Sequence, residues 1–307
     1  NGKEKTMIYN EFGQLTKRTL SEYETTFVYD QYGSLESESS DNGISKSYVR
    51  DALGRLSSNR EEVDGYWFQY SYNYSSTTGL PESKVYNFSS GGNAITENYA
   101  YQNGTLTEIK QNGQNSIWKL LSEDAFGHPT AVSTGPLNRT YSYDDYGNLL
   151  TQTATYGNGD VQKVTNTYSN NTADWLIGLL TRSVSVSTVN SSSQTNTVDY
   201  SYYSTTGLLH TQTVEPNQTA YKSVVTYTYD EYGNVATKTK TVGNTSRVES
   251  YKYVNGRFVD THTDVLGQVE SFIYEPVSGL MSSHTDINGD KSTYTYDGFG
   301  KIKTQTS

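Results

Sequence analysis

A nine-residue pattern recurs along this chain and constrains its fold more than any other feature. In its clearest copy, residues 227–235, the sequence reads Tyr-Thr-Tyr-Asp-Glu-Tyr-Gly-Asn-Val. Tyr227 and Tyr229 are two residues apart, so in a β-strand they point to the same face. Asp230 suits the first position of a type I turn, and Gly233 suits the position of positive φ from which the chain returns. The pattern therefore predicts one corner of a β-hairpin.

The same corner recurs with its parts in register. The clear copies share a tyrosine, an aspartate directly after it, and a glycine three residues after the aspartate. These residues are Tyr29, Asp30 and Gly33; Tyr143, Asp144 and Gly147; Tyr229, Asp230 and Gly233; and Tyr296, Asp297 and Gly300. A weaker copy spans residues 9–15, and Asp51 and Gly54 keep the turn without the tyrosine. Self-similarity of this kind is typical of repeat proteins, whose units pack mainly on their neighbours.

The pattern predicts an all-β fold, in which β-hairpins repeat in a continuous, spiralling antiparallel sheet. No stretch of twelve residues keeps the apolar spacing of a helix. We expect one continuous array, partly degenerate over residues 1–160 and closer to the pattern over residues 161–307. The polar inserts at residues 87–97 and 189–197 are predicted to be protruding loops. Asn103-Gly104 predicts a two-residue hairpin turn.

The composition favours a thin sheet over a dense core. Hydrophobic residues make up 33% of the chain, and tyrosine is the largest contributor, with 29 copies against 8 phenylalanines. A tyrosine ring buries about 150–250 Å² while its hydroxyl needs a polar partner. A sheet with a half-solvated face can meet both requirements.

Charge and residue usage exclude several classes of function. The net charge is −10 and there is no cluster of lysine and arginine, which argues against binding nucleic acid. No run approaches the ~18 apolar residues of a membrane helix. Without cysteine, the chain has no disulfides and no thiolate metal sites. No signal-peptide pattern is visible, and both ends look like cuts from a longer polypeptide.

We expect no enzyme, no cofactor and no metal site. The turn aspartates could suggest paired catalytic carboxylates, but a turn that needs a carboxylate acceptor explains each of them. They are Asp30, Asp51, Asp144, Asp230 and Asp297. Residues 286–290 resemble the start of a calcium loop but lack its distal glutamate. The histidines are scattered without ligand spacing: His128, His210, His262 and His284.

The tryptophans are the candidate ligand contacts. Trp67 and Trp118 could stack on sugar rings, although packing within the sheet also explains them. Trp175 begins the most apolar run of the chain, residues 175–180, which favours burial.

The repeated Tyr-x-Tyr-Asp-x-x-Gly-x-Leu/Val unit resembles the Rhs/YD-repeat family of bacterial polymorphic-toxin and insecticidal toxin-complex shell proteins. Residues 167–181 look like a segment that interrupts the repeats in these shells, and residues 256–289 are similar to their downstream repeats. The likeness covers nearly the whole chain, loosely before about Gly127 and closely after it.

The resemblance implies a section of a hollow β-shell that encapsulates a C-terminal toxin polypeptide before delivery. The implied partners are toxin cargo of the same polypeptide or the remaining shell repeats, together with a secretion-system or toxin-complex component. The chain would then be exported from a bacterium, to the cell surface or the medium. A cell-surface adhesin or carbohydrate-binding module is an alternative, because relatives on animal cells use the shell in adhesion. A third reading, an enzymatic β-propeller, fits the length but not the irregular glycine spacing.

Overall fold

The computed structural model describes residues 4–20 and 22–307, and these residues form 26 β-strands and no helix. The prediction of an all-β, antiparallel array of hairpins is confirmed. The chain divides into two compact units, residues 1–117 with 273–307, and residues 118–272. This division follows contacts between strands, whereas the expected change at residue 160 concerned how closely the repeats keep the motif. No helix long and apolar enough to cross a membrane is found in the described residues.

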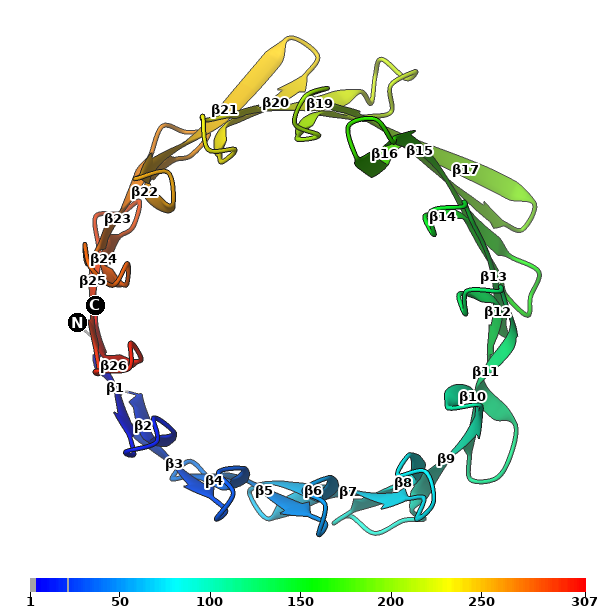
Figure 1. Ribbon diagram of the computed structural model, residues 1–307, viewed down its shortest axis with the longest axis vertical. Helices are drawn as coiled ribbons and strands as arrows, with labels where there is room; N and C mark the ends of the chain where they lie inside the picture. Colours follow the sequence, from blue (N-terminus) through cyan, green and yellow to red (C-terminus); the bar gives the residue numbers. More distant parts are fainter. Residues whose placement is uncertain (1–3, 21) are drawn as a thin grey trace. The chain divides into compact units, whose positions relative to one another are not determined.

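The first unit is a sheet in which each strand is antiparallel to the next. The order is β24-β25-β26-β1, then β2 to β10 in sequence. The last strand of the chain therefore pairs with the first (Figure 1). The strands are β1 (Glu4–Tyr9), β2 (Leu15–Leu20), β3 (Tyr23–Tyr29), β4 (Leu35–Ser40), β5 (Ile44–Arg50), β6 (Leu56–Val63), β7 (Tyr66–Tyr74), β8 (Pro81–Phe88), β9 (Ile95–Gln102), β10 (Thr105–Gln111), β24 (Met281–Thr285), β25 (Lys291–Tyr296) and β26 (Ile302–Thr306).

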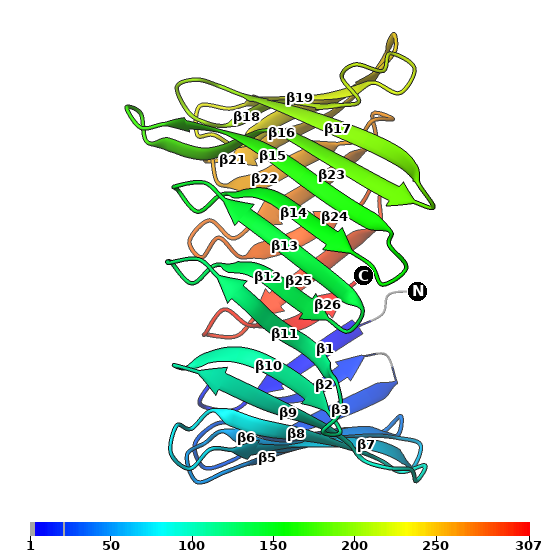
Figure 2. The same cartoon turned by 90° about the vertical axis from the view of Figure 1, so that its right-hand side faces the viewer.

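In the second unit the strands follow chain order, and neighbours again run antiparallel with turns at alternate ends (Figure 2). Its strands are β12 (Pro129–Thr134), β13 (Leu137–Tyr143), β14 (Leu149–Thr155), β15 (Val161–Asn171), β16 (Leu176–Val189), β17 (Ser192–Tyr202), β18 (Leu209–Val214), β19 (Ser223–Tyr229), β20 (Val235–Val242), β21 (Thr245–Val254) and β22 (Phe258–Thr263). The boundaries between the units fall within β11 (Ser116–Glu123) and β23 (Val269–Tyr274).

Neither unit has a second layer of structure. Within each unit the strands contact the strands with which they pair. Among the described residues, Val132 and Ala154 are the buried apolar side chains, with 7% and 5% of their surface exposed. Most strand residues are half-buried, as expected where tyrosine and threonine line a sheet that water reaches. Stability therefore comes from the ladder, from cross-strand side-chain pairs and from the turns.

One predicted loop is instead a long hairpin. Residues 189–197 lie in β16 and β17, which are 14 and 11 residues long and joined by a turn at Asn190 and Ser191. Alternating Thr, Ser and Val along β16 suit a strand, so the polar insert extends the hairpin rather than interrupting it. In the other insert only residues 89–94 lie outside the strands. Residues 103–104 form the two-residue turn between β9 and β10.

Candidate functional site

The corner at residues 230–234 shows how the repeated pattern folds. The Asp230 amide donates to the Asn234 carbonyl at 2.9 Å, and the Gly233 amide donates to the Asp230 carbonyl at 3.1 Å. Oδ1 of Asp230 accepts the amides of Tyr232 and Asn234, both at 2.9 Å. Gly233 has φ +86°, which a residue without a Cβ adopts freely. The corner is a type I turn with a glycine in the left-handed position of a bulge.

The same set of hydrogen bonds recurs at other corners. In each, an aspartate or asparagine accepts two backbone amides, and the amide three residues later donates to its carbonyl. These residues are Asn10, Asp30, Asp51, Asp124, Asp144, Asp264, Asp286 and Asp297. The corners at Asp264 and Asp286 lie at the opposite ends of the strands from the other corners. The Asn234 side-chain amide holds the pKa of Asp230 below its ordinary value, because it stabilises the ionised carboxylate.

A second interaction joins neighbouring hairpins at nine junctions. The backbone ladder between two neighbouring hairpins stops before it reaches their corners. Beyond the last ladder pair, a tyrosine hydroxyl of one hairpin donates to a backbone carbonyl of the other. Between β18 and β19 the last pair is Thr211 with Thr226. The hydroxyl of Tyr229, three residues after Thr226, donates to the carbonyl of Leu209, two residues before Thr211, at 2.8 Å.

The spacing is the same at every junction that has this bond, with distances of 2.7 to 3.2 Å. We call these donors the bridging tyrosines: Tyr9, Tyr29, Tyr74, Tyr143, Tyr168, Tyr202, Tyr229, Tyr253 and Tyr296. Their acceptors are, in the same order, the carbonyls of Ile302, Leu15, Leu56, Pro129, Leu149, Leu180, Leu209, Val235 and Met281. Tyr101 holds the same register position between β8 and β9, but its hydroxyl does not donate to the Pro81 carbonyl. Four bridging tyrosines belong to the predicted turn signature, namely Tyr29, Tyr143, Tyr229 and Tyr296.

Burial raises the pKa of bridging tyrosines above the ordinary value of 10.0, because the ionised phenolate would lose solvation. The shift is resolved for Tyr9, Tyr29, Tyr74, Tyr143, Tyr202, Tyr229, Tyr253 and Tyr296. The neutral hydroxyl is also the form that can donate to a carbonyl.

This raised pKa predicts a loss of stability in alkali. A folded-state pKa above the unfolded value contributes stability that is complete below about pH 10 and is lost as pH rises through the folded pKa. We expect Tm to hold between about pH 8 and pH 9.5 and to fall between about pH 10 and pH 12, with phenolate absorbance rising as the chain unfolds. A Tm that is level across the upper range would contradict the role of the bridging tyrosines.

Corner side chains also reach the next corner along the sheet. The residue after a corner glycine donates to the carbonyl of the next corner's glycine: Gln14 to Gly33 at 2.8 Å, Arg55 to Gly79 at 3.0 Å, and Asn234 to Gly256 at 2.9 Å. The corners are therefore linked both by tyrosine and by these amide or guanidinium donors.

The residue before the corner glycine is largely exposed at most corners. These side chains are Phe12, Tyr32, Leu53, Phe126, Tyr146, Tyr232, Leu266 and Phe299, and all are exposed. The repeated aromatic or leucine at this position does not support the turn by burial, so most corners present an apolar side chain at the surface, whereas the corner at Asp286 has Asn288 there.

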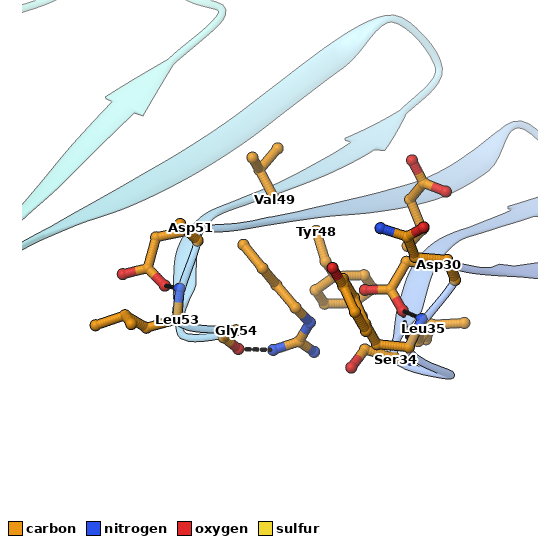
Figure 3. A pocket seen from close by; sticks show the side chains of 13 residues that line it. Asp30, Ser34, Leu35, Tyr48, Val49, Asp51, Leu53 and Gly54 are labelled. Carbon is orange, nitrogen blue, oxygen red and sulfur yellow. Dashed lines mark hydrogen bonds between the residues drawn. The ribbon is translucent and has the colours of Figure 1, made fainter.

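The junction between β4 and β5 has no tyrosine at the bridging position. Between β4 and β5 the last ladder pair is Ser37 with Ser47, so the register places Arg50 where other junctions have a bridging tyrosine. A cavity of about 770 Å³ lies here, lined by the corners at residues 30–36 and 48–54 (Figure 3). At the junction between β18 and β19, where Tyr229 is present, the cavity is about 290 Å³.

The predicted ligand-stacking residues lie in the sheet. Trp67 is half-buried in β7, and the Arg60 guanidinium carbon lies 4.7 Å from its ring centroid, so one ring face is covered. Trp118 is half-buried in β11. The expected burial of Trp175 is wrong. It lies at the turn before β16 with φ 55° and 86% of its surface exposed, because the apolar run enters the strand only at Leu176.

The histidines take part in local contacts. His128 Nδ1 lies 2.9 Å from Oδ2 of Asp124 in its own corner. His210 and His262 contact tyrosine rings at 4.6 Å between centroids. No group of three metal-ligating side chains is found in the part of the chain that the structure describes.

No family model and no curated protein sequence matches this chain. Solved structures do match. A crystal structure of TcdB2-TccC3-TEV is 13% identical, with a TM-score of 0.47, over 98% of this chain and 20% of that chain. The pore form of a Photorhabdus luminescens Tc holotoxin is 14% identical, with a TM-score of 0.36, over 97% of this chain and 18% of that chain. A porin-like protein from Bacteroides uniformis is 10% identical, with a TM-score of 0.29, over 99% of this chain and 93% of that chain.

The chain thus spans about a fifth of the length of the Tc toxin chains that it matches. The family resemblance noted from the corner motif is accompanied by a structural match over nearly the whole chain to Tc toxin proteins.

Proposed function

We propose that this chain is a non-enzymatic scaffold, a section of the wall of a β-shell that encloses a polypeptide. The observation that carries the proposal is the recurrent junction, in which a bridging tyrosine joins neighbouring hairpins at nine places within a sheet of one layer. Such a sheet has no interior of its own in which to form an active site. Its two faces and its edges are the surfaces with which it can bind other molecules.

The physics of the repeat suits a wall. Each hairpin added to the sheet satisfies the backbone groups at the edge of the previous one, so the array extends without exposing unpaired amides. Cross-strand hydroxyl pairs such as Thr228 with Thr237, at 2.6 Å, lie on the strands. A surface rich in serine, threonine and asparagine would hold an enclosed chain weakly, which favours its later release.

The enclosed polypeptide, by analogy with the Rhs/YD-repeat resemblance, is a toxin segment of the same protein, C-terminal to this region. The partners would be further shell repeats and a toxin-complex or secretion-system component. The protein would act after export from a bacterium, in the medium or at the cell surface.

Protease protection tests this function. The protein encoded by the whole reading frame that contains this sequence is digested with trypsin, and the lifetime of the segment encoded after Ser307 is followed. We expect that segment to survive at least about tenfold longer than the same segment expressed alone. Equal lifetimes would show that the wall encloses nothing.

A second candidate, carbohydrate binding at a cell surface, is favoured by the exposed Trp175. With Tyr146, Thr172 and Ile177 it lines a cavity of about 480 Å³. An accessible indole beside a phenol is a suitable surface for stacking on a sugar ring. Binding on a glycan array that is lost in Trp175→Ala and kept in Trp67→Ala would support it, because one face of the Trp67 ring is covered by Arg60.

A further inference from the structure

The junction between β4 and β5 has the acceptor of the tyrosine bridge but not its donor. The register rule pairs the residue three after Ser47 with the residue two before Ser37, which are Arg50 and Leu35. Nη1 of Arg50 lies 3.4 Å from the carbonyl of Gly54, in its own corner. Among the described residues, no side chain donates to the Leu35 carbonyl.

The space that a bridging ring would fill is open. Tyr32, Tyr48 and Leu53 line the cavity of about 770 Å³ together with Leu35 and Arg50. Tyr48 is half-buried, whereas Tyr32 and Leu53 are exposed at 85% and 76%. Figure 3 shows Leu35 and Leu53 on opposite sides of the cavity, with Tyr48 between them. Aromatic and aliphatic walls with one backbone acceptor are suited to a ring that carries a hydroxyl donor.

Cations contact the bridging rings at other junctions. The Arg55 guanidinium carbon lies 4.2 Å from the ring centroid of Tyr74, and Nζ of Lys301 lies 5.2 Å from that of Tyr9. Arg50 forms no ion pair with the described residues, and its guanidinium lines the cavity with one long hydrogen bond, to the Gly54 carbonyl, so it can make the same contact with a ring. The carboxylates of Asp30 and Glu36 also line the cavity and disfavour an anionic ligand.

We infer that this cavity is a binding site for the neutral side chain of a tyrosine in a partner peptide. The phenol ring enters between Tyr48 and Leu53, its hydroxyl donates to the Leu35 carbonyl, and Arg50 lies over the ring. The bound tyrosine takes the place that a bridging tyrosine fills at the other junctions. This site goes beyond containment and does not depend on it.

A titration with short peptides tests the site. The probes are acetyl-Gly-Tyr-Gly-amide and its phenylalanine and phosphotyrosine counterparts, added to the ¹⁵N-labelled chain. We expect saturable shifts of the Leu35 and Leu53 amide signals with the tyrosine peptide. The phenylalanine peptide should bind about fivefold more weakly, since it lacks the donor, and the phosphotyrosine peptide should give no saturable shift. Shifts that do not saturate with the tyrosine peptide, or equal binding of all three, would overturn the assignment.

Arg50→Tyr provides the matched variant. This substitution places a tyrosine side chain of the protein itself in the cavity. We therefore expect Tm to rise and the tyrosine peptide no longer to shift the Leu35 amide signal. Arg247→Tyr, at an exposed position in β21, is the control and should leave both unchanged. If Arg50→Tyr binds the peptide as the parent chain does, with no rise in Tm, the cavity is not the vacant position of a bridging tyrosine.

Discussion

Replacing Tyr229 with alanine is expected to lower the free energy of unfolding by about 2–3 kcal/mol. The ring is half-buried at the junction between β18 and β19, and its centroid lies 6.0 Å from that of Tyr203. Truncation removes this apolar contact and leaves the Leu209 carbonyl without the donor that now lies at 2.8 Å. Urea unfolding of the variant and the parent chain measures the difference.

Tyr232→Ala is the control, because it removes the same side chain three residues away in the same corner. Tyr232 is 65% exposed and its hydroxyl forms no hydrogen bond with the described residues, so the change should stay within about 0.5 kcal/mol. Equal losses from the two variants would show that tyrosine matters here through general packing and not through the bridge. Tyr229→Phe keeps the ring and should cost about 1 kcal/mol, the contribution of the hydroxyl.

The corners could be predicted from the sequence because their interactions are local. Asp230 reaches amides only two and four residues ahead, and Gly233 adopts its φ within the same turn. A nine-residue window therefore contains both the donors and the acceptors. The strands between corners followed from alternation and turn spacing for the same reason.

The bridges could not be located in this way because their acceptors are backbone carbonyls of another hairpin. Tyr229 and Leu209 are 20 residues apart, and Tyr9 and Ile302 are 293 residues apart. A carbonyl leaves no mark in the sequence, so only the register of the ladder identifies it. A signal for the donor was present, since tyrosine stands directly before the turn aspartate at Tyr29, Tyr143 and Tyr296.

The candidate binding site was harder still to predict, because it consists of a departure from the repeat. Arg50 before Asp51 looks like simple degeneration of the motif until the tyrosine at that position is known to fill a space. The predicted burial of Trp175 was wrong for a different reason. The apolar run beside it suggested burial, but a turn residue of positive φ before β16 projects from the sheet.

Gly300→Val should destabilise the chain by about 2 kcal/mol. Gly300 has φ +78° in the corner between β25 and β26, a conformation that a β-branched residue adopts only with strain. A Cβ at this position would lie 3.5 Å from Cδ1 of Leu280, an ordinary contact, so the cost comes from the backbone and not from a clash.

Gly298→Val in the same corner separates these causes. Gly298 does not have a positive φ, and a Cβ there would meet no atom within 4 Å. The substitution should therefore be nearly neutral, within about 0.5 kcal/mol, or slightly stabilising because valine has fewer conformations than glycine in the unfolded chain. Urea unfolding of the two variants gives the comparison. A similar loss from both would mean that valine disturbs this corner at either position, and the left-handed glycine would not be what closes the hairpin.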